Sequence, residues 1–471
     1  MSNDAGVQRN PMNSQSKQVV ICGAGIAGVS AAYHLAAVNG LDEILIIDER
    51  PPLSLTSDKS TECYRNWWPG PGDGMVSLMN RSIDILEELS ETHGNPFNLN
   101  RRGYVFATAN ADRIEDFKTQ GEEAASLGAG LLRIHDGSSA TSPYQPAPAS
   151  GYKDQPTGSD LILDRALIGE HFPYLVEETL GLLHARRAGW FDGQQLGRLL
   201  LEQARFSGAQ LLEGRVTGVD VESGRVEAVH VDTPNGPQRI ATRNFVNAAG
   251  PFLEQVGKLV GAELPVFAEL HAKVAIQDRL GAFPREAPML IWTDPQYLPW
   301  RQEERDALLE DESLRFLLEE FPQGAHGRPE GPADSPIILL IWTYDMQPTP
   351  PTFPLKFDPN YPEIAMRGVA TFLPAMEAYF DRPPRPIVDG GYYMKTEENR
   401  PLIGPMGVEG AWVIGALSGY GLMAACAAGE LLATQIKGDE PPDYASWFTL
   451  DRYEDPDYQS LLANWSRSGQ L

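Results

Sequence analysis

The chain has 471 residues, long enough for two or three domain-sized units that each bury a hydrophobic core. Hydrophobic residues make up 42% of the sequence and charged residues 22%, as in ordinary soluble globular proteins. The 64 acidic residues outnumber the 38 basic ones and give a net charge of -26, so the surface repels nucleic-acid backbones and anionic lipid, and we expect neither as a partner.

Cysteine usage and the N-terminus suggest where the protein works. Cys22, Cys63 and Cys426 are an odd number without paired spacing, which argues against a disulfide framework and for a reducing compartment. Residues 1–17 are polar and lack an apolar signal core, so we expect a disordered tail rather than a targeting segment. The sequence therefore predicts a cytoplasmic protein without a membrane span.

The strongest pattern in the sequence runs from Gln18 to Ala37. Val19 to Cys22 form a short apolar run typical of a strand that is covered on both faces. The G-x-G-x-x-G spacing that follows lets the chain turn tightly and presents a helix N-terminus to a diphosphate. We therefore expect the loop to bind a dinucleotide through Gly23, Ala24, Gly25, Ile26, Ala27 and Gly28.

A second apolar strand, residues 44–47, completes the expected βαβ unit. It ends at Asp48, close to the spacing of ~20 residues at which an acidic side chain binds the adenosine ribose. Asp48 is the candidate, with Glu49 in reserve. The alternatives are a structural turn or a membrane span, and Asp42 and Glu43 argue against the span.

The rest of the chain alternates between helical and strand patterns. Apolar periodicity predicts helices over residues 75–90, 114–127, 193–207, 301–321 and 422–436. Strands are expected near residues 103–108, 211–221, 225–232, 245–250, 337–344 and 412–414. The loop over residues 51–74 carries aromatic and charged side chains of the kind found at binding sites, and residues 138–159 have the composition of a crossover between domains.

Four stretches resemble the flavoproteins of the D-amino-acid oxidase superfamily, which includes sarcosine oxidase, glycine oxidase and dimethylglycine dehydrogenase. They are the glycine loop with Asp48, residues 214–216, residues 247–251, and the pair 396–404 and 418–423. The resemblance implies an α/β fold in which a Rossmann-like FAD-binding domain is assembled from separated segments. A second, α+β substrate domain built on an antiparallel sheet is expected to cover the flavin.

The resemblance also implies a domain division and further cofactor contacts. The FAD-binding domain would comprise residues 18–100, 161–258 and 389–438, the substrate domain residues 101–160 and 259–388, and a surface segment residues 439–471. The backbone of Val216 would contact adenine. The remaining FAD contacts would come from Ala249, Gly250, Ser418, Gly419, Tyr420, Gly421, Leu422 and Met423.

The chemistry implied by the resemblance is oxidation of a C–N bond. Hydride passes from the carbon beside an amine to flavin N5, and water hydrolyses the resulting imine. Oxygen, a quinone or another flavoprotein would then accept the electrons. The substrate is expected to be an amine or an N-substituted amino acid.

Three positions depart from the family pattern. Gly391 stands where sarcosine oxidase has the cysteine that tethers the flavin, so we expect non-covalent FAD. Met423 and Tyr393 stand where the family has the Lys or Arg that holds a substrate carboxylate. The candidates to replace that charge are Arg65 and Lys395.

The catalytic candidates are therefore Arg65, Tyr393, Lys395 and Tyr420, and each has a structural alternative. Arg65 could stack on the neighbouring aromatic rings, the tyrosine hydroxyls could satisfy structural hydrogen bonds, and Lys395 could be solvated. The scattered histidines predict no metal site. A non-catalytic or assembly-type flavoprotein of the same fold stays open as the alternative function.

Overall fold

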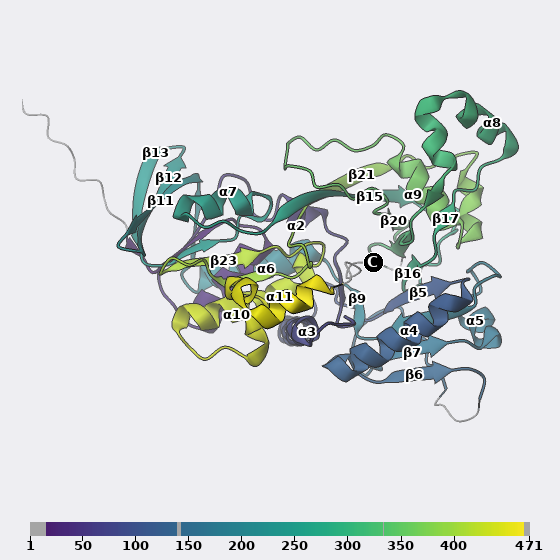
Figure 1. The fold of residues 1–471 in the computed structure, drawn as a ribbon, viewed down its shortest axis with the longest axis horizontal. Coiled ribbons are helices and arrows are strands. Elements are labelled where there is room, and N and C mark those ends of the chain that lie inside the picture. Colours follow the sequence, from purple (N-terminus) through teal and green to yellow (C-terminus); the bar gives the residue numbers. More distant parts are fainter. Residues whose placement is uncertain (1–15, 139–142, 333, 466–471) are drawn as a thin grey trace, which may run out of the picture.

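The computed structural model describes residues 16–138, 143–332 and 334–465. It has a mixed α/β fold with two large sheets that lie side by side (Figure 1). Most of the expected N-terminal tail, residues 1–15, lies outside the described residues. Ser16–Lys17 forms β1 and pairs with β13, so regular structure begins two residues before the expected end of the tail.

The first large sheet has the Rossmann-like organisation that was expected. Its strands are parallel except for the edge strand β22, and they come from separated stretches of the chain. In spatial order they are β10 (Gln210–Glu213), β3 (Ile44–Asp48), β2 (Val19–Cys22), β14 (Phe245–Asn247), β23 (Ala411–Gly415) and β22 (Leu402–Pro405).

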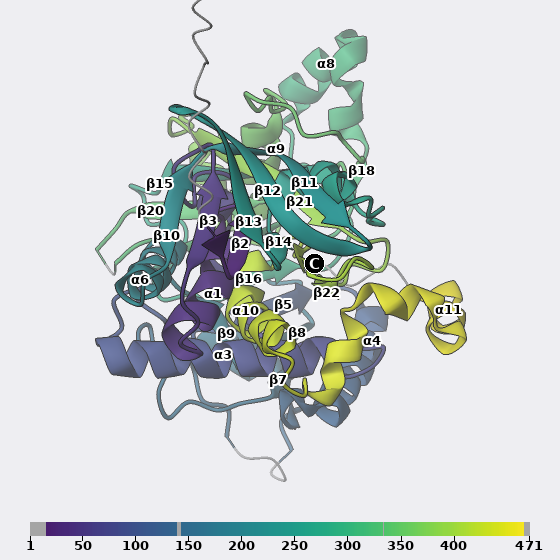
Figure 2. The same cartoon turned by 90° about the vertical axis from the view of Figure 1, so that its left-hand side faces the viewer.

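Alternate side chains of the central strands face different layers. Val19 and Ile21 pack with the helices, whereas Val20 and Cys22 pack against a small four-stranded sheet. Figure 2 shows the six-stranded sheet between these layers. The helical layer contains α1 (Ile26–Tyr33), α3 (Gly74–His93), α6 (Gly193–Phe206) and α10 (Gly421–Lys437).

The predicted strand over residues 211–221 divides at Gly214. The first part is β10, and the second is β11 (Arg215–Glu222), which forms a hairpin with β12 (Arg225–Thr233) in the small sheet beside β13 (Gly236–Thr242). A Cβ on Gly214 would lie 2.7 Å from Val231 and 2.8 Å from the Asp232 carbonyl oxygen. The chain therefore changes sheets at a residue that has no side chain to clash.

The second large sheet has nine strands and is mainly antiparallel, as expected for the substrate domain. Only the pairs β16/β5 and β6/β7 are parallel. In order the strands are β21 (Ile387–Lys395), β15 (Phe267–Gln277), β20 (Ile337–Ile341), β19 (His326–Pro329), β16 (Met289–Trp292), β5 (Tyr104–Thr108), β8 (Gly181–Ala185), β7 (Ser159–Ile162) and β6 (Leu132–His135).

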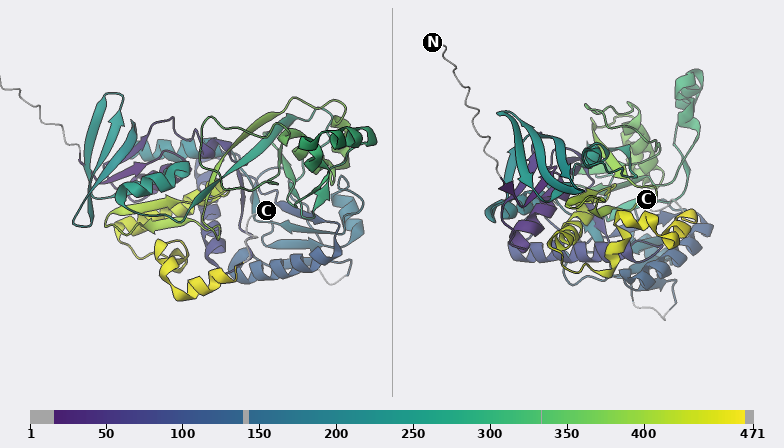
Figure 3. Two further views of the ribbon diagram at one scale, coloured as in Figure 1. Left: turned by 45° about the horizontal axis from the view of Figure 1, so that its top comes forward. Right: turned by 60° about the vertical axis from the view of Figure 1, so that its left-hand side comes forward.

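Two strands of this sheet do not follow the expected domain ranges. The ranges 161–258 and 389–438 were assigned to FAD binding, yet β8 and most of β21 lie in the nine-stranded sheet. In Figures 1 and 3, β15 and β21 extend from this sheet towards the six-stranded one. The two sheets are thus joined by paired long strands rather than by a flexible linker.

Shorter elements complete the fold. They are α2 (Thr56–Lys59), α4 (Ala111–Ala124), α5 (Arg165–His171), α7 (Leu253–Gly257), α9 (Tyr361–Ala370), α11 (Pro456–Ala463) and the two-stranded pairs β4 (Cys63–Arg65) with β9 (Ala188–Trp190) and β17 (Gln296–Tyr297) with β18 (Glu320–Phe321). The charged helix predicted over residues 301–321 was wrong in length. It divides into α8 (Gln302–Glu310) and a 3₁₀ helix, Glu312–Leu318, because the extended Asp311 ends one and caps the other by accepting from the Ser313 N–H.

The C-terminal segment packs more deeply than a surface segment would. Phe448 is fully buried, and Arg452 donates to Glu398 at 2.6 Å beneath the surface. No helix in the described part of the chain is both long enough and apolar enough to cross a bilayer.

We expect Gly429→Ala to destabilise the fold by about 1–3 kcal/mol, as overpacking does at close contacts. The new Cβ would lie 2.4 Å from the Ser30 hydroxyl and 2.8 Å from Ser30 backbone, where α10 packs against α1. Gly169→Ala is the matched control because no atom lies within 4 Å of its Cβ position in α5. Urea unfolding measures both, and equal stability of the two variants would contradict this packing.

Candidate active site

Two adjoining cavities lie where the two large sheets meet. The first, which we call the trough, is lined by the start of α1, by α2, by β21 and by the loop between β23 and α10. The second, which we call the cationic pocket, is lined by β4, β15, the loop before β19 and the first turn of α10. Tyr393 and Gly419 line both, so the cavities share a wall.

The glycines at the trough have different roles. Gly23 and Gly28 allow close packing, because a Cβ on Gly28 would lie 2.0 Å from the Gly23 carbonyl oxygen and a Cβ on Gly23 would lie 2.3 Å from the Ala248 carbonyl oxygen. Gly25 instead lines the trough at the N-terminus of α1. Gly250 also lines it, with φ of 52°, and its Cβ position is open space. At these two glycines the trough is therefore bounded by backbone without a side chain.

Ser57 was not singled out from the sequence. Its hydroxyl accepts a hydrogen bond from the Ile26 N–H at 2.9 Å, at the first residue of α1. A helix N-terminus attracts anions, and a hydroxyl there can donate to one. The available signal was the serine- and threonine-rich composition of the loop after Asp48.

The acidic candidates lie beside the glycine loop. Asp48 accepts hydrogen bonds from the Ala24 N–H at 2.8 Å and the Arg50 N–H at 2.9 Å, so one carboxylate braces the loop and the end of β3. Glu49 pairs with Arg215 and Arg50, and the hydrogen bond from Arg215 is the main reason its pKa is lowered. Neither carboxylate lines the trough.

The other predicted cofactor contacts divide among three places. Val216 follows Gly214 at the start of β11 and is buried in the core beneath the small sheet. Ala249 lies just before Gly250, at the end of β14. The predicted contacts that line the trough itself are Gly25, Ile26, Ala27, Gly250, Ser418, Gly419, Gly421 and Leu422.

The loop before α10 has a strained backbone. Ala416 and Ser418 adopt φ of 52° and 46°, a left-handed conformation that costs roughly 1–3 kcal/mol in a residue other than glycine. The Ser418 N–H donates to the Met394 carbonyl at 2.9 Å, which ties the loop to β21. The loop lines the trough, and Tyr420 and Met423 beyond it line the cationic pocket.

The cationic pocket has an unusual charge for so acidic a protein. Among the described residues that line it, Lys59, Arg65 and Lys273 are cationic and none is Asp or Glu. Aromatic and small polar side chains make up much of the rest, including Trp68, Tyr104, His271, His326, Thr343, Tyr393 and Tyr420. Lys59 is already ion-paired with Asp58 at 2.6 Å and Asp389 at 3.1 Å, so the charge that suits the pocket to an anionic ligand comes from Arg65 and Lys273.

Arg65 is the most buried of these cations, with 7% of its surface exposed. Its guanidinium lies 4.4 Å from the ring centre of Trp68 and 5.6 Å from that of Tyr104, and Nε donates to the Trp67 carbonyl at 3.2 Å. Within the described chain no carboxylate pairs with it. Burial lowers its pKa, but an arginine stays charged at neutral pH.

The two lysines on neighbouring strands have different surroundings. Lys395, the sequence candidate, lies 3.0 Å from Glu269 and lines neither cavity. Lys273 does line the cationic pocket; its ammonium donates to the Ser60 carbonyl at 2.7 Å, and burial lowers its pKa. The missed signal was the alternation of Glu269, His271 and Lys273 along β15, since alternate residues of a strand share a face.

The two tyrosine candidates also differ. The Tyr393 ring stacks on His271 with centroids 4.1 Å apart, its hydroxyl makes no hydrogen bond to the described residues, and burial raises its pKa to about 12. The Tyr420 hydroxyl donates to the Asn399 carbonyl at 2.9 Å, while its ring points edge-on to Trp68. Tyr420 therefore contributes a ring to the pocket, and its hydroxyl has a structural role.

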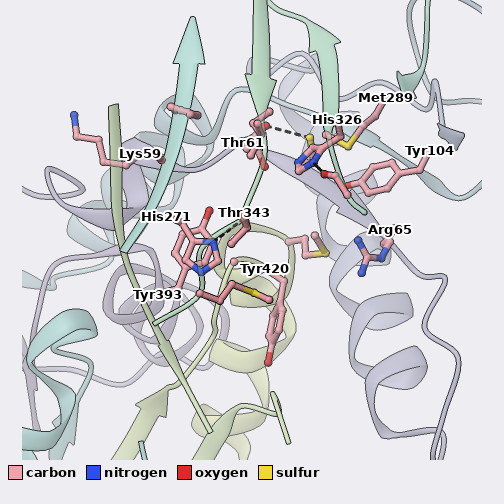
Figure 4. A pocket seen from close by; sticks show the side chains of 18 of the residues that line it. Lys59, Thr61, Arg65, Tyr104, His271, Met289, His326, Thr343, Tyr393 and Tyr420 are labelled. Carbon is pink, nitrogen blue, oxygen red and sulfur yellow. Dashed lines mark hydrogen bonds between the residues drawn. The ribbon is translucent and has the colours of Figure 1, made fainter. Parts of the chain in front are cut away.

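Figure 4 shows Arg65 and the His271–Tyr393 stack at opposite sides of the pocket. Cys63, also on its wall, donates its thiol hydrogen to the Thr61 carbonyl at 3.1 Å, and burial raises the thiol pKa. Over residues 16–138, 143–332 and 334–465, no group of three or more His, Cys, Asp or Glu is arranged to hold a metal ion.

Residues 18–435 match the family described as FAD dependent oxidoreductase. Human mitochondrial dimethylglycine dehydrogenase is 26% identical over 93% of this chain and 45% of its own length. Human mitochondrial sarcosine dehydrogenase is 26% identical over 55% of this chain and 25% of its own. The chain thus spans less than half the length of these relatives.

Solved structures share the fold. L-proline dehydrogenase from P. horikoshii superposes with a TM-score of 0.70 at 20% identity, covering 94% of this chain and 98% of that one. Glycine oxidase from Geobacillus kaustophilus superposes with a TM-score of 0.68 at 17% identity, covering 93% and 99%. The family match, over most of the chain, and the shared fold agree with the glycine loop and the trough: the chain belongs to the DAO family of FAD-dependent oxidoreductases.

Proposed function

We propose that this protein oxidises the C–N bond of an amine that carries a carboxylate, such as an N-substituted amino acid. The observation that supports this substrate class most is the charge of the pocket beside the trough: Arg65 and Lys273 line it without an ion pair to a described carboxylate, and none of the described lining residues is Asp or Glu. The relatives named for dimethylglycine and sarcosine dehydrogenation are consistent with such a substrate.

FAD fits the trough because the wall consists largely of backbone and small residues. We propose that the diphosphate lies at the N-terminus of α1 near Gly25 and Ser57, and that Asp48 holds the ribose. Val216 would contact adenine, and the loop over residues 418–423 would face the flavin. When bound, the flavin supplies the hydride acceptor.

The cationic pocket would then hold the substrate. We propose that Arg65 binds the carboxylate, because it is a buried cation that lacks an anionic partner in the described chain. Lys395 is paired with Glu269, and Lys59 with Asp58 and Asp389, so Lys273 is the lysine of the pocket that makes no ion pair within the described residues. The rings of Tyr393 and Tyr420 would exclude water from the reacting carbon.

We further propose that FAD is held without a covalent bond. Gly391 has no side chain to bond to it, and the Cys63 thiol is buried and donates to Thr61. Oxygen, a quinone or another flavoprotein would accept the electrons. The three cysteines are free and buried, which is consistent with the reducing compartment, the cytoplasm, that we propose.

Arg65→Met should separate carboxylate binding from oxidation. We expect kcat/KM for N,N-dimethylglycine to fall by roughly 10²-fold or more, since losing one side of a buried charge pair costs about 2–5 kcal/mol. The value for dimethylethylamine, which has no carboxylate, should change little. Steady-state assays measure the ratio of kcat/KM for N,N-dimethylglycine to kcat/KM for dimethylethylamine. The control is Arg102→Met, which replaces a buried arginine outside the pocket.

An equal loss for both amines would contradict the role of Arg65 in carboxylate binding. The alternative function, a non-catalytic flavoprotein, is tested in the same preparation. If a panel of amines with and without carboxylates leaves the flavin of the anaerobic wild-type protein oxidised, catalysis of this class is excluded.

Asp48→Ala should weaken FAD binding by roughly tenfold, since a hydrogen bond to a charged group contributes about 1.5–3 kcal/mol. Fluorescence titration of the apoprotein with FAD measures the Kd. Asp42→Ala, an exposed aspartate just before the same strand, is the control and should bind FAD as wild type does. Unchanged affinity in Asp48→Ala would remove Asp48 from the cofactor site, and flavin that stays with acid-precipitated protein would show covalent attachment.

A further inference from the structure

A hydroxyl, an imidazole and a carboxylate form a chain of hydrogen bonds at the wall of the cationic pocket. Thr343 Oγ1 lies 3.2 Å from His271 Nδ1, and His271 Nε2 lies 3.0 Å from Glu269 Oε2. Lys395 Nζ donates to the same Glu269 oxygen at 3.0 Å. Figure 4 shows the first of these bonds and the stack of His271 on Tyr393.

The chemistry of the partners fixes the direction of these bonds. Glu269 is ionised because, although burial alone would raise its pKa, His271 and Lys395 lower it. An ionised carboxylate only accepts, so Nε2 of His271 carries the hydrogen. In the neutral ring Nδ1 then accepts from the Thr343 hydroxyl, and that hydroxyl oxygen can still accept a hydrogen bond from a ligand.

The chain of bonds connects two cavities. His271, Ala272 and Thr343 line the cationic pocket and also a second cavity that adjoins it. That second cavity has the exposed side chains Asp345, Lys356 and Asp358 among its lining residues. His271 therefore lies between the pocket and the solvent.

We propose that Thr343, His271 and Glu269 form a proton relay that takes the ammonium proton from the substrate nitrogen and releases it through the second cavity. This inference rests on the proposed function. It assigns a role to His271 and Thr343, which the sequence patterns did not single out.

The proton and the electrons balance as two separate steps. First, the N–H bond of the substrate ammonium breaks: its proton passes to Thr343 Oγ1 while the Thr343 proton passes to His271 Nδ1, giving an imidazolium beside Glu269. The freed nitrogen lone pair would then be available to form the C=N bond as the neighbouring carbon gives up hydride, for which the FAD of the proposed function would be the two-electron oxidant. The imidazolium finally gives its proton to water in the second cavity.

The surroundings keep His271 neutral and able to accept. Burial lowers its pKa, and Lys395 acts in the same direction, whereas Glu269 opposes them. The titratable and charged groups on the elements around it are Glu269 and Lys273 on β15, Tyr393 and Lys395 on β21, Tyr344 and Asp345 after β20, Lys356, Asp358 and Tyr361 beyond the second cavity, and Lys59, Arg65 and His326 across the pocket.

The test is the rate of anaerobic flavin reduction by N,N-dimethylglycine in the holoenzyme, followed by stopped-flow absorbance from about pH 6 to about pH 10. At pH 7 we expect Thr343→Val and His271→Phe to be slower than wild type by roughly 10²-fold, the usual scale of acid–base catalysis. Towards pH 10 the reduction rates of both variants should approach the wild-type rate, because an alkylammonium with a pKa of roughly 10 is by then largely neutral in solution.

The variants are chosen to separate proton transfer from packing. His271→Phe keeps a ring against Tyr393, and Thr343→Ser restores the hydroxyl and should recover most of the rate. Thr349→Val, which removes a hydroxyl of the second cavity that does not contact His271, should behave as wild type. FAD content and Tm confirm that each variant is folded.

Three outcomes would overturn the relay. If the variants reduced their flavin more slowly than wild type by the same factor at every pH, the residues would act through structure and not through proton transfer. If Thr343→Val reduced its flavin at the wild-type rate, the Thr343 hydroxyl would not be part of the proton path. Wild-type enzyme whose flavin no amine reduces would overturn the proposed function as well. The first two results leave the proposed function standing, so the two failures are distinguishable.

Discussion

A guanidinium that is removed from water and lacks a carboxylate partner is the central constraint of this site. Desolvating a charge costs several kcal/mol unless an anion compensates, and most other buried arginines of the chain have one: Arg186 pairs with Asp160, Arg367 with Glu304 and Arg452 with Glu398. Arg65 instead has the aromatic faces of Trp68 and Tyr104, the polar side chain of Tyr104 and a backbone carbonyl. A bound carboxylate would supply the missing charge, which connects the substrate class to the energetics of the fold.

The same site depends on how the two sheets are joined. β15 pairs with β21 along nine residues, and this ribbon carries His271, Lys273 and Tyr393 to the cationic pocket beside the trough. The Ser418 N–H bonds to the end of β21, so the strained loop before α10 is held against the ribbon. Because these contacts join the sheets, the proposed flavin site and the proposed substrate site are positioned by one continuous set of hydrogen bonds.

Local patterns in the sequence were sufficient to predict the main strands and helices of the Rossmann-like part. Short apolar strands, the glycine spacing and apolar helical periodicity predicted β2, β3, α1 and α6, because those signals act over a few residues. Arg65 was chosen because it lies among aromatic residues in a loop rich in site-forming side chains. Lys395 was chosen, and Lys273 was missed, because the pairing of Lys395 with Glu269 across the strands is invisible without the register of β15 and β21. The Thr343–His271 contact joins residues 72 positions apart, and no local pattern predicts it.

The central claim, that the pocket is built for a carboxylate, is tested most directly by a ligand that cannot be oxidised. 3-Methylbutanoate has the shape of N,N-dimethylglycine with carbon in place of nitrogen, and 3-methylbutanamide is its neutral counterpart. Titration of the FAD-loaded protein, followed by the flavin absorption spectrum, gives a Kd for each. Our account predicts that the carboxylate binds at least roughly tenfold more tightly than the amide, as a charge-assisted hydrogen bond to Arg65 requires. Equal affinities would contradict it.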